Sequence, residues 1–146
     1  MSFFDTLSIS ASALTAERQR TEIIAANLAN ADTTHTQAGG PYKRREVVFQ
    51  SEAGSPFQFS LASAHSGEEP GAVKIAEVVD DPTPPVMRYE PGHPDANKQG
   101  YVAFPAINPA MEMVDLMDSV RAYQLNASAI AATKQMIQQT IDVLKS

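Results

Sequence analysis

Glycine and proline are distributed so unevenly that they divide this chain of 146 residues into three parts. All seven glycines lie between residues 30 and 108, as do all ten prolines except Pro109. Proline removes a backbone donor and clashes inside a helix, and glycine weakens a helix, so long helices are confined to the two ends. The pattern predicts a helix over residues 2–29 and a second helix from Pro109 to the C-terminal end.

Both predicted helices carry start signals. Asn108 is a preferred N-cap, Pro109 fits the first helical position, and Glu112 is favourable in the first turn. Ser2 and Asp5 have the spacing of a capping box at the first helix. We therefore expect the second helix to begin at Pro109.

Each predicted helix also has an apolar stripe at alternating steps of three and four residues, which is typical of a coiled coil. Arg18 and Thr21 interrupt the first stripe, and Lys134 interrupts the second. Periodicity leaves open whether the stripes meet in an intramolecular hairpin or also contact neighbouring subunits. The expected interface residues are Phe4, Leu7, Leu14, Leu28, Leu116, Val120, Tyr123, Ile130, Ile137 and Ile141.

The middle of the chain is predicted to be rich in β-structure. Short runs of β-branched and aromatic residues, bounded by turn signals, occur at residues 46–49, 57–61, 73–79 and 101–104. The predicted fold class is α+β, with long terminal helices forming a coiled coil and a small β-rich module inserted between them. The expected segments are an N-terminal helix (1–32), a β-rich module (33–107) and a C-terminal helix (108–146).

Composition excludes several classes of function. The net charge is −6 without a basic patch, which disfavours a nucleic-acid partner. There are no cysteines, so a disulfide framework and a thiol nucleophile are excluded. No run reaches the roughly 18 apolar residues of a membrane span. The N-terminal residues lack the basic leader of a cleavable secretory signal, so we expect none to be cleaved.

The end of the first predicted helix contains a recognisable motif. Asn27 and Asn30 are suited to C-capping, because a short amide bonds free carbonyls and asparagine tolerates the left-handed conformation. Their context, ISASALTAERQRTEIIAANLANADTT (residues 9–34), resembles the N-terminal signature shared by flagellar rod and hook proteins. The resemblance implies a self-assembling axial protein.

Two further segments narrow the resemblance to the FlgC type of that family. They are VVDDPTPPVMRYEPGHPDANKQGYVAFP (residues 78–105) and EMVDLMDSVRAYQLNASAIAATKQMIQQTIDVL (residues 112–144). The chain departs from the pattern over residues 37–72 and at Ala106, where an asparagine is expected. The motif residues carried over are Asn27, Asn30, Pro91, Gly92, His93, Pro94, Asp95, Gly100 and Tyr101.

His93 and Asp95 allow two interpretations. They could belong to a metal or general acid/base site, but such a site needs several converging groups, and the three histidines have no ligand-like spacing. We favour a role for His93 in a hydrogen bond that holds the turn. Neither a metal nor another cofactor is expected.

The resemblance implies a structural subunit of the proximal rod of the flagellar basal body, and no enzyme. Such a subunit is exported uncleaved by the flagellar type III export apparatus and assembles in the periplasm with copies of itself and other rod proteins. The helical shaft so formed transmits torque. The alternatives are another axial protein or a soluble coiled-coil adaptor. For a rod subunit we expect a protected centre over residues 30–108 and labile helices in the free chain.

Overall fold

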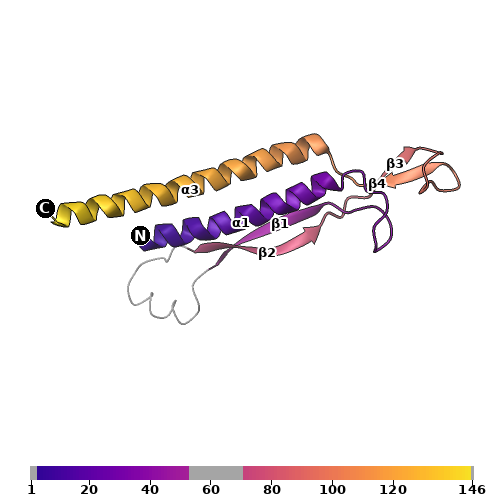
Figure 1. Ribbon diagram of the computed structural model, residues 1–146. Helices are drawn as coiled ribbons and strands as arrows, with labels where there is room; N and C mark the ends of the chain where they lie inside the picture. The colour runs from indigo at the N-terminus through magenta and orange to yellow at the C-terminus, as the bar shows by residue number, and fades with distance from the viewer. Residues whose placement is uncertain (1–2, 53–70, 146) are drawn as a thin grey trace. The chain divides into compact units, whose positions relative to one another are not determined.

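The computed structural model describes residues 3–52 and 71–145 of the chain (Figure 1). In these residues it has a long helix at each end and four strands between them, which confirms the α+β fold class. The elements in chain order are α1 (Phe3–Ala29), β1 (Arg45–Glu52), β2 (Ala72–Asp80), β3 (Val86–Tyr89), β4 (Tyr101–Phe104) and α3 (Pro109–Lys145).

The start of α3 is the one predicted from the sequence. The amide of Ala110 donates to Asn108 Oδ1 at 3.0 Å, and the amide of Glu112 donates to the Asn108 carbonyl at 3.1 Å. Asn108 therefore caps the helix with both its side chain and its backbone. The capping box proposed at Ser2 lies outside the described residues.

The end of α1 agrees only in part with the prediction. Asn30 Nδ2 donates to the carbonyl of Ala26 at 2.8 Å, so Asn30 bonds a free carbonyl as expected. No non-glycine residue in the described ranges has a positive φ, so Asn30 caps the helix without adopting the left-handed conformation that asparagine tolerates. Its backbone amide also lies 3.2 Å from the Asn27 carbonyl, and the amide of Ala31 donates to the Leu28 carbonyl at 3.3 Å, so the helix ends in i→i−3 bonds without a reversal of φ.

The described strands form two sheets of two strands each, β1 with β2 and β3 with β4. The strands expected at residues 46–49, 73–79 and 101–104 are confirmed as parts of β1, β2 and β4. The strand expected at 57–61 lies outside the described residues. Strand β3 was not predicted, because its sequence, Val-Met-Arg-Tyr, shows no alternation of apolar and polar residues. All four of its side chains are exposed.

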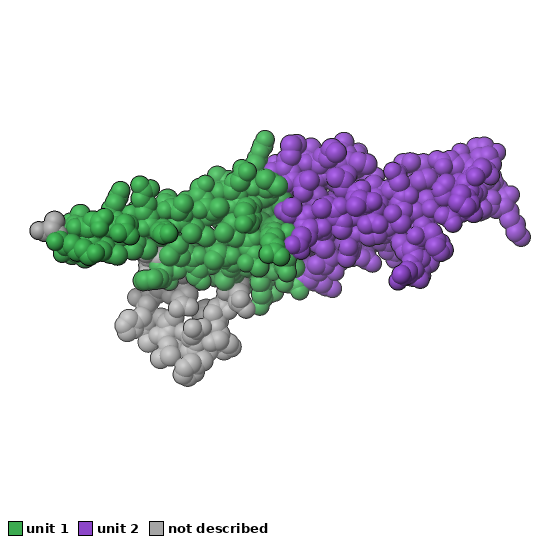
Figure 2. All heavy atoms as spheres, in the orientation of Figure 1, with its two compact units in different colours: residues 1–19, 49–76, 119–146 green, residues 20–48, 77–118 purple. Residues whose placement is uncertain are grey.

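The chain divides into two compact units (Figure 2). Unit 1 comprises Met1–Gln19, Phe49–Ala76 and Ser119–Ser146, and unit 2 comprises Arg20–Val48 and Glu77–Asp118. Each unit thus combines segments of both helices with segments of the strands. The three-part division expected from composition is a different one, and independent folding of its parts stays a prediction.

Unit 1 has a core of small side chains. Among its described residues, Ala16 is the buried apolar residue, and the buried polar residues are Ser10, Ser119 and Thr133. Ser119 Oγ lies 3.2 Å from the carbonyl of Glu17, which links the two helices within this unit. The amide of Val73 donates to Ser12 Oγ at 3.0 Å, which ties β2 to α1.

Unit 2 has larger buried side chains from several segments. Its buried apolar residues are Ile24, Ala31, Val102 and Phe104. Phe104 contacts the ring of His93, with centroids 6.1 Å apart, and lies 4.5 Å from the guanidinium carbon of Arg88. The short sheet of β3 and β4 is thereby packed by its own hairpin connection.

That connection is a rigid turn. Tyr89 pairs with Tyr101 across the antiparallel strands, with ring centroids 5.3 Å apart. The His93 Nδ1 atom accepts a hydrogen bond from the amide of Asp95 at 3.1 Å, which is the turn bond expected of this histidine. Asn97 Oδ1 accepts from the amide of Tyr101 at 3.0 Å and so fixes the end of the turn.

Gly100 closes the turn in a conformation that other residues adopt at a cost. Its φ is +81°, and an added Cβ would lie 2.8 Å from Tyr89 Cε2 and 3.2 Å from Pro91 Cβ. We predict that Gly100→Ala lowers the free energy of unfolding by about 1–3 kcal/mol, from the left-handed backbone and the contact with Tyr89. Gly92→Ala is the control, since a Cβ there meets nothing within 4 Å. Equal losses for both variants in urea denaturation would contradict this account.

Candidate functional site

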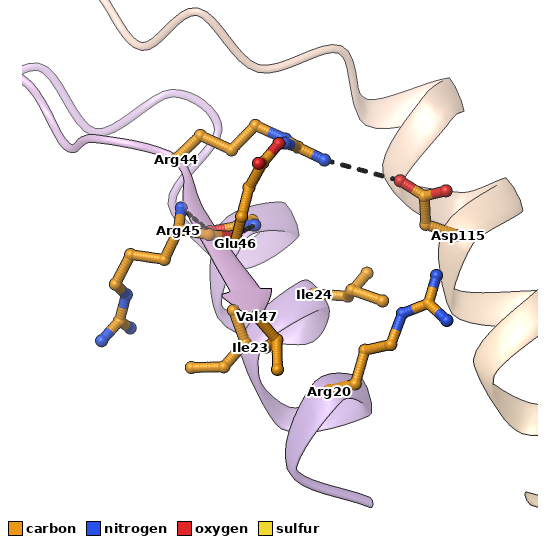
Figure 3. A pocket seen from close by; sticks show the side chains of 9 residues that line it. Arg20, Ile23, Ile24, Arg44, Arg45, Glu46, Val47 and Asp115 are labelled. Carbon is orange, nitrogen blue, oxygen red and sulfur yellow. Dashed lines mark hydrogen bonds and ion pairs between the residues drawn. The ribbon is translucent and has the colours of Figure 1, made fainter. Parts of the chain in front are cut away.

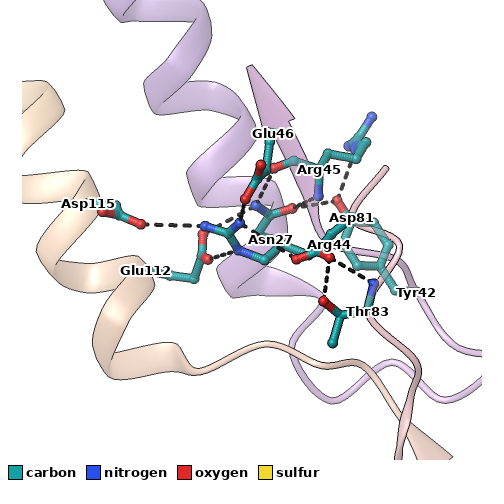
Figure 4. A network of polar contacts seen from close by, with 9 residues as sticks. All are labelled: Asn27, Tyr42, Arg44, Arg45, Glu46, Asp81, Thr83, Glu112 and Asp115. Carbon is teal, nitrogen blue, oxygen red and sulfur yellow. Dashed lines mark hydrogen bonds and ion pairs between the residues drawn. The ribbon is translucent and has the colours of Figure 1, made fainter. Parts of the chain in front are cut away.

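A cluster of polar side chains joins the end of α1, the beginning of β1 and the start of α3 within unit 2 (Figure 4). Asn27, in the last turns of α1, is 1% exposed. Its Oδ1 accepts from the Arg45 amide at 3.0 Å and from the Tyr42 hydroxyl at 3.1 Å. Its Nδ2 donates to the Arg45 carbonyl at 2.9 Å and to Glu112 Oε2 at 3.2 Å. All four hydrogen-bonding positions of the amide are used.

The role predicted for Asn27 is therefore wrong. Its side chain bonds no carbonyl of its own helix end, and instead pairs with both backbone groups of Arg45, as a neighbouring strand would. Sequence spacing identified a polar residue near a helix end but gave no information on a partner 18 residues away. Asn27 fixes the beginning of β1 to α1.

Glu112 is the buried carboxylate of the cluster, and it needs both a counter-charge and hydrogen-bond donors. It lies in the first turn of α3 and is 1% exposed, and its Oε1 accepts from Arg44 Nε at 2.5 Å. A buried carboxylate is stable only when it is paired and hydrogen-bonded. Arg44 supplies the opposite charge and Asn27 the second hydrogen bond. The sequence predicted only a favourable interaction of Glu112 with the helix dipole.

Arg44 is surrounded by carboxylates. Besides Glu112, its guanidinium pairs with Glu46, with Asp115 at 3.5 Å and with Asp81 at 4.0 Å. Burial alone would lower the pKa of Arg44, but the hydrogen bond and charge of Glu112, followed by those of Glu46, raise it above its ordinary value. Arg44 is therefore the charge that holds the group together. The one sequence signal for it is the run Lys43-Arg44-Arg45 directly before a predicted strand.

Asp81 belongs to the exposed side of this cluster. Its Oδ1 accepts from Thr83 Oγ1 at 2.5 Å and from the Thr83 amide at 2.8 Å. These two bonds, with a smaller contribution from Arg44, lower the pKa of Asp81 from its ordinary value of 3.8. The backbone amide of Asp81 also donates to the Arg44 carbonyl at 2.7 Å. Asp81 thus supports the segment that carries Arg44.

A pocket of about 180 Å³ lies beside the cluster (Figure 3). Its lining combines apolar side chains with the cluster's charged groups, and consists of Arg20, Ile23, Ile24, Asn27, Arg44, Arg45, Glu46, Val47 and Asp115. Within residues 3–52 and 71–145, no group of three or more histidine, cysteine, aspartate or glutamate side chains could hold a metal ion. The charges of the cluster bind one another, so the arrangement serves to join elements.

The predicted interface residues divide into two classes of exposure. The half-buried ones are Leu7, Leu14, Leu28, Leu116, Ile130 and Ile137, and the exposed ones are Phe4, Val120, Tyr123 and Ile141. The most buried positions of α3 are instead Glu112, Ser119 and Thr133. The buried face of α3 is therefore centred beside the apolar stripe, because small side chains permit close approach and bulky ones lie at its flanks. Which of these residues form subunit interfaces stays a prediction.

The motif residues of the β3–β4 turn lie mostly at the surface. His93 and Gly100 are half-buried, while Pro91, Gly92, Pro94, Asp95 and Tyr101 are exposed. Asp95 Oδ2 accepts a hydrogen bond from Thr34 Oγ1 at 2.6 Å, so the turn is tied to the segment that follows α1. The motif shapes a surface. It also brings His93 Nδ1 to 3.9 Å from Asp95 Oδ2, but among the described residues no third such side chain joins them to form a metal site.

Large apolar side chains are exposed along α3 on both flanks of its buried face. Met113 and Met117 are 55% and 54% exposed, and they lie one turn apart. The others are Met111, Val114, Val120, Leu125, Met136, Ile141, Val143 and Leu144. Despite this apolar surface, neither helix has, in its described residues, a segment apolar and long enough to cross a membrane.

Comparison with known proteins connects this architecture to one family. Residues 7–34 match the family described as Flagella basal body rod protein, and residues 98–143 match Flagellar basal body rod FlgEFG protein C-terminal. The flagellar basal-body rod protein FlgC of Bacillus subtilis is 41% identical over 99% of this chain and 100% of its own length. The chain belongs to the FlgC family.

Other FlgC proteins agree. Those of Escherichia coli O157:H7 and Borreliella burgdorferi are 37% and 33% identical, over 97% and 99% of this chain and the same shares of their own lengths. The resemblance inferred from the sequence motifs is thereby confirmed, including the choice of the FlgC type. Asn27 lies in the N-terminal matched region and Glu112 in the C-terminal one, so the polar cluster joins the two matched regions.

The ion pair of Arg44 and Glu112 gives a first test of the FlgC cluster. We predict that Arg44→Met lowers the free energy of unfolding by about 3 kcal/mol, because it leaves a buried carboxylate without its counter-charge. Adding Glu112→Leu removes both charges and should recover part of this loss. A double-mutant cycle in urea gives the coupling energy. Losses that simply add would contradict the pairing.

The hydrogen bonds between Thr83 and Asp81 give a second test, in which pH is varied. Thr83→Val removes one of the two hydrogen bonds to Asp81, so we predict that the pKa of Asp81 rises toward 3.8. With its lowered pKa, Asp81 stabilises the fold above pH 3.8, and this contribution is lost as the pH falls through the folded pKa. The variant should therefore lose less stability on acidification. NMR titration of the Asp81 carboxyl measures the shift, and an unchanged pKa would refute the assignment.

Proposed function

We propose that this chain is a structural subunit of the proximal rod of the flagellar basal body. The observation that carries the proposal is the similarity to FlgC proteins along nearly the whole of both chains. The subunit assembles with copies of itself and with other rod proteins. Repeated contacts that do not close a ring generate an open helical filament, and such a filament, built of long helices, resists twisting and can transmit torque.

The exposed apolar surface of α3 supports this proposal. A helix that is apolar around most of its circumference is normally buried on several sides. The residues that the structure describes cover one face of α3, and methionine side chains adapt readily to different neighbours. Neighbouring subunits would cover the flanks. In this proposal the half-buried Leu116, Ile130 and Ile137 bridge between the chain's own contacts and those neighbours.

The remaining features follow from membership of a rod. Rod subunits function outside the cytoplasm, so we propose export by the flagellar type III export apparatus without a cleaved signal peptide, and a final location in the periplasmic part of the basal body. We propose no catalytic activity and no cofactor. The charged groups of the polar cluster are consistent with this, because they bind one another and serve to join the elements of unit 2.

Charges placed on the exposed flank test the role of α3. We predict that Met113→Glu combined with Met117→Glu leaves folding within about 0.5 kcal/mol of the parent, because both side chains are more than half exposed. The carboxylates would lose their water in an assembled interface, so the rod should not form. Expected results are normal secretion, no rod in isolated basal bodies and no swimming.

The control adds the same two charges at polar positions of the same helix. Gln124→Glu and Gln135→Glu lie at exposed positions and should reduce assembly much less. Both variants are tested in the bacterium that encodes the chain, by electron microscopy of basal bodies and by motility. Normal rods built from the Met113 and Met117 variant would show that this flank is no interface.

A further inference from the structure

We infer that the polar cluster is a clamp that keeps unit 2 folded in the unassembled chain, and that the ordering of helices on assembly is confined to unit 1. The clamp can be tested on the free chain alone. Only the statement about assembly rests on the proposed function. The ordered centre of the free chain is then wider than residues 30–108. It begins at Arg20, within α1, and ends at Asp118, within α3.

The first argument is the difference between the two cores. Burial of apolar surface stabilises a fold in proportion to the area removed from water. In the described part of unit 1 this burial is centred on Ala16 and on small hydroxyl side chains, whereas unit 2 buries Ile24, Val102 and Phe104. Most of the stability of a helix in a protein comes from tertiary packing, so the unit 1 helix segments depend on what packs against them. They are the segments that a neighbouring subunit would stabilise most.

The second argument is that the cluster forms only when three segments are present together. Glu112 from α3 is satisfied by Asn27 from α1 and by Arg44 from the segment before β1. Removing any one of them leaves a buried group without a partner, which is strongly unfavourable in a medium of low polarity. These bonds therefore open together, and unit 2 behaves as one cooperative body.

The third argument concerns register. Asn27 bonds both the amide and the carbonyl of Arg45, and a slip of β1 by one residue along α1 would break both bonds. Buried polar groups are known to fix one register among competing apolar arrangements. The apolar stripes of α1 and α3 allow several registers, because many of their positions are alike. The clamp selects one of them before any neighbour is present.

Amide hydrogen exchange of the free chain tests the inference, at a concentration where sedimentation shows a monomer. We expect residues 20–29 and 109–118 to be protected together with β3 and β4. Residues 3–19 and 119–145 should exchange fast. Exchange that is equally slow in both sets would overturn the inference, and so would exchange that is equally fast.

Asn27→Asp is the decisive variant. It removes both amide donors and places a second carboxylate beside Glu112. We expect exchange at residues 20–29 and 109–118 to accelerate by more than about tenfold, the effect of losing a hydrogen bond to a charged group. Exchange at residues 3–19 and 119–145 should stay the same. Asn30→Asp is the matched control, because that amide bonds only within its own helix end, and it should change exchange much less.

A double variant keeps the test decisive if Asn27→Asp does not fold. Asn27→Asp with Glu112→Gln restores one carboxylate and one amide at the two positions, so a hydrogen bond between them can form again with the donor reversed. We expect it to recover part of the protection at residues 109–118. No recovery would refute the clamp. A protected unit 2 in a chain that builds no rod would refute the proposed function and leave the clamp intact.

Discussion

The burial of one carboxylate sets conditions that much of unit 2 has to meet. Glu112 is inaccessible to water, so a positive charge and a hydrogen-bond donor must both reach it. Arg44 can do so only if β1 begins where it does, and Asn27 only if α1 continues to Ala29. The N-cap at Asn108 in turn fixes the turn of α3 from which Glu112 projects. Helix ends, strand start and ion pair therefore depend on one another.

The two helices bury and expose different kinds of side chain. Their most buried positions include small or polar residues such as Ser10, Ala16 and Ser119, which give modest stabilisation and allow close approach. The bulky apolar residues of α3, such as Met117 and Leu125, remain exposed in the single chain. In a monomer such a surface favours aggregation, whereas in a filament subunit it supplies the contacts. A chain with its largest apolar side chains buried would be more stable as a monomer. It would expose less apolar surface for contact with a neighbouring subunit.

The sequence predicted the features that depend on local chemistry. Glycine and proline placement gave both helices, Asn108 gave the start of α3, and β-branched runs gave β1, β2 and β4. It failed where a structure depends on distant partners. The bonds of Glu112 span 85 residues to Asn27 and 68 residues to Arg44, and no periodicity reports such a pairing. Strand β3 was missed for a related reason, since its exposed side chains pair with β4 through backbone bonds that composition does not reveal.

The family models have the same limit, and the structure shows why. The two matched family regions cover residues 7–34 and 98–143, which hold Asn27 and Glu112 but leave out Arg44. Each region by itself describes a helix with a polar residue near one end, for which capping or a dipole interaction is a sufficient explanation. Arg44 supplies the charge that makes the burial of Glu112 possible, and it lies in the stretch between the matched regions. Arg44, whose charge lets the two helices meet in one cluster, therefore lies outside both matched regions. The geometry of the cluster identifies it.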